Sequence, residues 1–97
     1  MIGSYAIGKY CVIRTYSAGV HVGVVAARNG REVLLRDTRR IWNWKGANTL
    51  HEIASSGVGE GSRVSVPVTE NLVTEAIEII VCSVDAEANL REAEWTE

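Results

Sequence analysis

The sequence has little of what disorder and membrane insertion require. It holds one proline and no low-complexity tract in 97 residues, and 46% of its residues are hydrophobic. We therefore expect a folded globular chain rather than a disordered one. No apolar run approaches the length that spans a bilayer, and the first ten residues lack the charged segment and apolar core of a signal peptide. We expect a soluble protein that stays in the compartment where it is made.

Residues that hold metals or carry out nucleophilic chemistry are also scarce. Cys11 and Cys82 fall in separate predicted strands, and His21 and His51 have no ligand at suitable spacing on the same element. The sequence contains no GxSxG elbow and no strand–GxxxxGK[ST]–helix phosphate loop, and neither cysteine has a histidine close in sequence. We expect two free thiols, no metal, no cofactor and no enzymatic activity.

Basic and acidic residues are concentrated in opposite halves of the chain. Residues 9–45 carry eight Lys or Arg against two acids, a net charge of +6, whereas residues 46–97 carry two Arg against ten acids, a net charge of −8. This asymmetry fits an anion site on one side, head-to-tail pairing between subunits, or solvated faces that differ in sign. The net charge of −2 argues against a protein that binds duplex nucleic acid.

Short runs rich in β-branched residues predict five strands. Gly23 indicates a bulge or a close backbone approach, and the dipeptide Asn29-Gly30 predicts a type I′ hairpin turn. The strand after this turn is long, so we expect a bend or a bulge near Asp37 and Thr38. Pro67 places its strand at an edge, and the last strand is the most apolar and is expected to be central. The predicted strands cover residues 9–16, 20–27, 32–44, 62–68 and 74–83.

One short helix and one terminal helix complete the expected fold. Thr49 and Glu52 have the spacing of a capping box, and Gly57 is placed as the C-terminal stop. The end of the chain reads as an amphipathic helix or tail that docks through Leu90 and Ala93. We predict one domain over residues 1–97, with a core at 9–83 and a terminal helix or tail at 84–97. Its class is α+β, with a mainly antiparallel, curled or barrel-like sheet and the order β-β-β-α-β-β-α.

The twelve residues 39–50 are the most informative segment. A strand period of two places Arg40, Trp42 and Trp44 on one face, and Arg39 and Ile41 on the other. A guanidinium beside two indoles suits a flat anionic ligand, because aromatic rings stack on bases and Arg pairs with phosphate. An equally open interpretation is that the two tryptophans are large core residues on a strand with charged neighbours.

A binding surface is therefore the main functional hypothesis. The first strand adds a second face on which aromatic residues flank a guanidinium, and the loop 17–19 follows it. Free backbone amides at the start of the short helix are a further place suited to an anion. The predicted ligand-binding residues are Arg14, Tyr16, His21, Arg40, Trp42, Trp44, Lys45, Asn48 and Thr49.

Two stretches carry a family resemblance. Residues 12–21 (VIRTYSAGVH) and 39–50 (RRIWNWKGANTL) resemble the hallmarks of a family of small proteins encoded by bacteriophages and prophages. The similarity runs from about Tyr10 to Cys82. The chain also resembles the phage sponge proteins that disarm CBASS, a bacterial immune system that signals through cyclic nucleotides. Such sponges form small oligomers and sequester cyclic dinucleotides such as cGAMP without cleaving them.

The resemblance implies a phage protein that acts in the host cytoplasm and sequesters a cyclic nucleotide signal. In that mechanism Trp42 or Trp44, with Tyr16, would stack on the bases, and the basic side chains would neutralise the phosphates. We also expect a homo-oligomer, because a small domain with an edge strand and opposite charge halves leaves surface for another copy. The alternatives are a structural or interaction protein of the phage, with the Trp pair in a subunit interface, and a weak single-stranded nucleic-acid binder.

Overall fold

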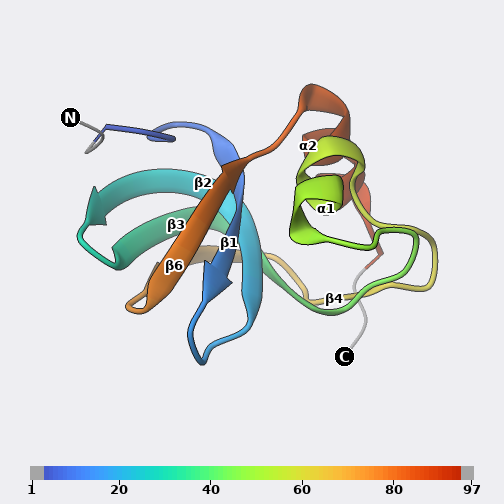
Figure 1. Cartoon of the computed structure of the whole chain (residues 1–97), viewed down its shortest axis with the longest axis horizontal. Helices are drawn as coiled ribbons and strands as arrows, with labels where there is room; N and C mark the ends of the chain where they lie inside the picture. The colour runs from blue at the N-terminus through green and yellow to red at the C-terminus, as the bar shows by residue number, and fades with distance from the viewer. Residues whose placement is uncertain (1–3, 95–97) are drawn as a thin grey trace.

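The computed structural model describes residues 4–94, with a curled antiparallel sheet at one end and two helices at the other (Figure 1). The α+β class and the antiparallel sheet predicted from the sequence are confirmed, although the sheet is not closed into a barrel. In chain order the elements are β1 (Tyr10–Thr15), β2 (Val20–Asn29), β3 (Glu32–Asn43), α1 (Leu50–Ser56), β4 (Arg63–Val64), β5 (Val68–Val73), β6 (Ala76–Val81) and α2 (Val84–Glu92).

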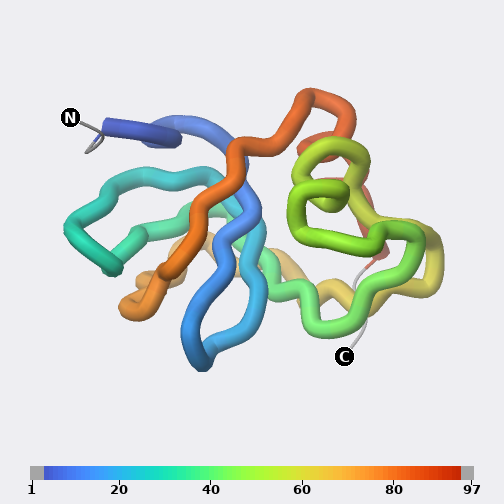
Figure 2. The backbone as a smooth tube through the Cα atoms, viewed as in Figure 1, coloured from blue at the N-terminus to red at the C-terminus, as the bar shows by residue number. Residues whose placement is uncertain are grey.

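The sheet has the strand order β4-β3-β2-β1-β6, and β5 pairs with the other half of β3. Only residues 74–75 separate β5 from β6, yet these two strands pair at opposite edges. The chain therefore crosses the open side of the curl, at the orange turn in Figure 2. Within residues 4–94, β6 pairs with β1 alone, so the prediction of a central strand over 74–83 is wrong.

The number of strands after α1 also differs from the prediction. The expected strand over residues 62–68 ends after Val64, and pairing with β3 resumes only at Val68. Pro67 lies in the gap, where its ring nitrogen cannot donate a ladder hydrogen bond. The structure thus has one strand more than the predicted order. Strands β4 and β5 both lie at an edge, as the proline indicated.

The bulge in β3 lies where the sequence predicted it. The register between β2 and β3 shifts opposite Gly23, and Asp37 has a φ of 51°. A Cβ atom on Gly23 would lie 2.9 Å from the Cβ of Thr38, so this glycine is required by the close approach of the bulged strand. The hairpin turn is Gly30 and Arg31, one residue later than expected. Gly30 alone has a positive φ there, so the turn is not type I′.

Two clusters of buried apolar residues lie on the two faces of β1. Tyr10 and Val12 face a helix-side core that includes Ile53 of α1 and Leu90 of α2. Their strand neighbours Cys11 and Ile13 face an inner core inside the curl, with residues of β2, β3 and β5. Because successive side chains point to opposite faces, β1 is buried on both sides and is the centre of the fold.

The helices follow their predicted signals. Thr49 caps α1 by accepting a hydrogen bond from the Glu52 N–H at 3.2 Å, and Gly57 ends the helix with a φ of 82°. The terminal segment is a helix rather than a tail, and Leu90 and Ala93 pack against the core as expected. Trp95 lies outside the described residues. Neither helix within residues 4–94 is long and apolar enough to cross a membrane.

One phenol and two thiols in or beside these cores make the stability of the domain sensitive to high pH. Burial raises the pKa of Tyr10 to about 12, of Cys11 to about 11 and of Cys82 to about 12, with the Arg91 guanidinium opposing the effect on Tyr10. The unfolded chain ionises these groups at about pH 9–10, so it releases their protons first. Stability is therefore full below about pH 9 and is lost as the pH rises toward the folded pKa values.

We expect urea unfolding to show a loss on the order of 2–3 kcal/mol between about pH 8 and pH 10.5. Tyr10→Phe should reduce this loss and leave stability at about pH 8 nearly unchanged, because the Tyr10 hydroxyl has no hydrogen-bond partner in the part of the chain described. Equal stability of the wild type at the two pH values would contradict this assignment.

Candidate functional site

The predicted alternation along residues 39–45 holds up to Trp42 and fails at Trp44. Arg39 and Ile41 are buried, whereas Arg40 is exposed and Trp42 is 50% exposed. Strand β3 ends at Asn43, so the period of two no longer applies to Trp44. Trp44 turns back and packs, half-buried, against the helix-side core. The two indoles therefore belong to different surfaces.

Four of the predicted ligand-binding residues line one cavity, which we call the helix-side hollow. Arg14 comes from β1, Trp44 from the end of β3, and Asn48 and Thr49 from the start of α1. The hollow has a volume of about 440 Å³, within the range of about 300–1,000 Å³ typical of small-molecule sites. Its complete lining is Arg14, Val20, Trp44, Asn48, Thr49, Leu50, His51 and Glu78.

The hollow combines an aromatic ring, an apolar floor and a cation. Val20, Trp44 and Leu50 each pack against the helix-side core, and all three line the hollow. Arg14 is exposed on the same face of β1 as Val12, which belongs to that core. A half-buried aromatic ring and an exposed guanidinium in one cavity can stack on a base and neutralise a phosphate.

The start of α1 offers fewer free donors than the sequence led us to expect. Glu52 accepts a hydrogen bond from the Asn48 backbone N–H at 3.2 Å, and Thr49 accepts from the Glu52 N–H. The capping box therefore uses the Asn48 amide, which was expected to face an anion, and also the amide of Glu52. What Asn48 and Thr49 can still supply are the side-chain amide and the hydroxyl proton.

Two polar residues in the hollow were not among the predicted site residues. Glu78 of β6 lies opposite Arg14 in the strand register, and His51 is the second residue of α1. The Glu78 carboxylate can accept hydrogen bonds from a ribose hydroxyl or a base N–H, but it would repel a phosphate. Nothing near Glu78 in the sequence marks it, because its place depends on the pairing of β6 with β1.

His21 and Arg40 line a different cavity, which we call the polar hollow. They are cross-strand neighbours on β2 and β3. The adjacent residues Val22 and Ile41 face the helix-side core, so His21 and Arg40 lie on the opposite face of the sheet. The volume is about 380 Å³, and the lining is His21, Thr38, Arg39, Arg40, Ser65, Val68, Glu70 and Asn71. The structure thus divides the predicted site between two faces.

The remaining predicted residues line neither hollow. Tyr16 is 79% exposed just after β1, and its backbone N–H donates to the Glu75 carbonyl at 3.0 Å. Trp42 lies beneath the guanidinium of Arg63, whose Cζ is 5.2 Å from the ring centroid. Lys45 is exposed, and its backbone N–H donates to the Ser62 hydroxyl at 2.8 Å.

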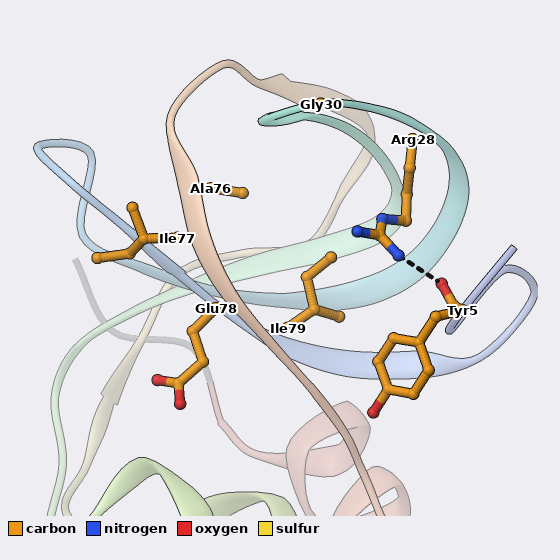
Figure 3. Close-up of a pocket in the computed structure, with 7 residues that line it drawn as sticks. All are labelled: Tyr5, Arg28, Gly30, Ala76, Ile77, Glu78 and Ile79. Atoms are coloured by element: carbon orange, nitrogen blue, oxygen red, sulfur yellow. Dashed lines mark hydrogen bonds between the residues drawn. The ribbon is translucent and has the colours of Figure 1, made fainter. Parts of the chain in front are cut away.

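A third cavity, the edge hollow, marks the open side of the curled sheet (Figure 3). It lies between β6 and the β2–β3 hairpin and has a volume of about 380 Å³. Arg28 donates from Nη1 to the Tyr5 carbonyl at 3.1 Å, and Ile79 points toward them. Its other lining residues are Gly30, Ala76, Ile77 and Glu78. The mostly apolar β6 side of this cavity offers no chemistry for an anionic ligand.

The cysteines are placed as packing residues. Cys11 is buried and Cys82 is half-buried, and both are free thiols in the structure. Burial holds both pKa values well above the ordinary range, so the reactive thiolate is scarce at neutral pH. Across residues 4–94, no three or more His, Cys, Asp or Glu side chains come together as a metal-binding group.

Comparison with known proteins gives a family without an assigned activity. No curated protein and no solved structure matches the chain. Residues 8–90 match the family model DUF6948, described as a domain of unknown function. Because this match covers most of the sequence, the chain belongs to the DUF6948 family.

Proposed function

We propose that this domain is a non-enzymatic binding protein whose helix-side hollow holds a nucleotide-like anion. The observation that carries the proposal is the convergence of Arg14, Trp44, Asn48 and Thr49 on one cavity. Arg14 and Trp44 were selected from the sequence for charge neutralisation and stacking, and they lie thirty residues apart in the chain.

Each wall of the hollow has a defined role toward such a ligand. Trp44 stacks on the base, and Val20 and Leu50 supply apolar surface beside it. Arg14 pairs with a phosphate oxygen at the exposed rim. Asn48 and Thr49 donate to the ligand from the helix start, and Glu78 accepts from a sugar hydroxyl or a base N–H.

The more specific proposal is that the ligand is a cyclic dinucleotide immune signal. It rests on the resemblance to phage proteins of the sponge type, which hold such signals without cleaving them. In this proposal the protein is encoded by a phage or prophage, acts in the host cytoplasm, and lowers the concentration of the signal by binding alone. Thiols that stay protonated at neutral pH fit a role without covalent chemistry.

A thermal-shift screen against cyclic di- and trinucleotides tests the proposal directly. A ligand that binds only the folded state should add roughly 2.7 kcal/mol at about 100 times its Kd. Arg14→Gln should weaken binding by about 1.5–3 kcal/mol, because a charge-assisted hydrogen bond is lost. Chromatography of the recovered ligand should show it unchanged.

Arg63→Gln is the matched control, because Arg63 is an exposed cation outside the hollow. It should bind each ligand with wild-type affinity. If no cyclic nucleotide stabilises the protein, or if Arg14→Gln and Arg63→Gln bind alike, the helix-side hollow is not a nucleotide site. If the ligand is recovered cleaved, the non-enzymatic proposal is wrong.

We further propose that the protein forms a homo-oligomer. Its strand β6 pairs only with β1 in the range 4–94, and exposed apolar side chains of Tyr5 and Ile77 lie beside this edge. Open edges pair readily with another strand. We expect light scattering at micromolar concentration to give a multiple of the 10.6 kDa chain mass. A monomeric mass would contradict the proposal.

A further inference from the structure

The floor of the polar hollow is built from polar side chains that the fold has buried. Thr38 is 1% exposed and His21 is 2% exposed. The Thr38 hydroxyl has no hydrogen-bond partner among the described residues. A buried hydroxyl without a partner keeps its full desolvation cost, so such groups are rare in folded proteins unless a water, an ion or a ligand satisfies them.

The charges around this floor favour an anion. Arg40 lies at the rim and forms no ion pair within the described part of the chain. Arg40 is the cross-strand partner of His21, which places its positive charge near the imidazole. Burial lowers the pKa of His21, and the Arg40 guanidinium lowers it further. The Glu70 carboxylate in the lining is already engaged by Arg36, with Nε to Oε2 at 3.3 Å.

The remaining lining groups supply one further donor and an imidazole whose proton is already used. The His21 Nε2 lies 3.1 Å from the Ala18 carbonyl, which can only accept, so Nε2 carries the proton and the ring is held in place. Asn71 contributes a side-chain amide at the rim. Thr38 lines the cavity with its hydroxyl buried, so binding requires a change of its χ1 rotamer that turns the hydroxyl toward the ligand.

We propose that the polar hollow is a second binding site, separate from the helix-side hollow, which takes a small oxyanion between the Arg40 guanidinium and the Thr38 hydroxyl. Arg40 supplies the charge, Thr38 and Asn71 donate hydrogen bonds, and His21 closes the floor. The two hollows lie on opposite faces of the sheet, so this site does not depend on the proposed nucleotide site.

The test is a titration of the full chain with inorganic phosphate at constant ionic strength, followed by amide chemical shifts in NMR spectra. We expect saturable shifts at His21, Thr38 and Arg40. Arg40→Gln and Thr38→Val should each weaken phosphate binding by about tenfold or more. Thr38→Val should also raise the melting temperature, because it removes a buried hydroxyl that lacks a partner.

Two controls and a second anion complete the experiment. Arg31→Gln removes an exposed cation outside the hollow, and Arg14→Gln removes the cation of the other hollow, so both should bind phosphate like the wild type. A parallel titration with acetate tests whether a carboxylate binds in the same way. Chemical shifts that saturate with both anions support a general oxyanion site, and shifts that saturate with phosphate alone support a phosphate site. Shifts that do not saturate, or wild-type affinity in either Arg40→Gln or Thr38→Val, overturn the proposal.

Discussion

Replacing Arg39 with methionine should lower the free energy of unfolding by about 3 kcal/mol or more, the largest effect we expect from one substitution. Arg39 is 4% exposed and donates three hydrogen bonds to backbone carbonyls. Its Nε reaches the Ser65 carbonyl at 2.8 Å, and Nη1 reaches those of Leu90 at 2.8 Å and Arg91 at 3.3 Å.

The physical reason is that one buried guanidinium holds the end of α2 against the sheet. The last carbonyls of a helix have no partner within the helix, and a positive charge there also favours the helix dipole. Methionine keeps much of the side-chain volume but leaves the three carbonyls without this donor. The Leu90 bond is buried and the other two are part-buried. An unsatisfied buried acceptor costs about 1–3 kcal/mol.

Arg40→Met is the matched control for Arg39→Met in urea unfolding. Arg40 is the next residue on the same strand, is exposed, and its side chain makes no hydrogen bond that the described residues show. Its replacement should change stability by no more than about 0.5 kcal/mol. Equal unfolding midpoints for the two variants would refute the role assigned to Arg39.

Replacing Trp44 with alanine should cost roughly 2–4 kcal/mol of stability, whereas Trp42→Ala should cost under about 1 kcal/mol. Trp44 is half-buried and packs on the helix-side core, so its removal leaves a cavity there. Trp42 is half exposed, and the contact described for its ring is with the exposed side chain of Arg63. Urea unfolding of the two variants measures this difference.

Trp44→Leu separates the packing role of this indole from its proposed stacking role. Leucine fills most of the apolar space and should recover much of the stability lost in Trp44→Ala, but it offers no ring to a base. In the proposed nucleotide site, Trp44→Leu should still lose about 1–3 kcal/mol of binding. Wild-type ligand affinity in Trp44→Leu would show that Trp44 is a core residue only. Equal stability of Trp42→Ala and Trp44→Ala would contradict the placement of the two rings.

Features set by neighbouring residues were predictable from the sequence. The capping box of Thr49 and Glu52, the stop at Gly57 and the bulge near Asp37 all appear in the structure. Each depends on backbone dihedrals and hydrogen bonds within a few residues, so local residue types determine it. The antiparallel pairing of β2 with β3 belongs to this class, because a short turn leaves little choice of partner.

Features that depend on distant pairing were decided by the tertiary structure alone. An apolar sequence predicted β6 to be central, but it lies at an edge, because residues 74–75 carry the chain across the open side of the curl. The predicted binding residues divide between two faces for two reasons. Arg14 and His21 lie on opposite faces through the register of β1 with β2. Strand β3 ends at Asn43, which releases Trp44 from the strand period. The sequence by itself determined the candidate side chains and their local structure. Packing of the curled sheet against α1 and α2 determined which of those side chains meet, since the buried area that selects one arrangement comes from residues far apart in the chain.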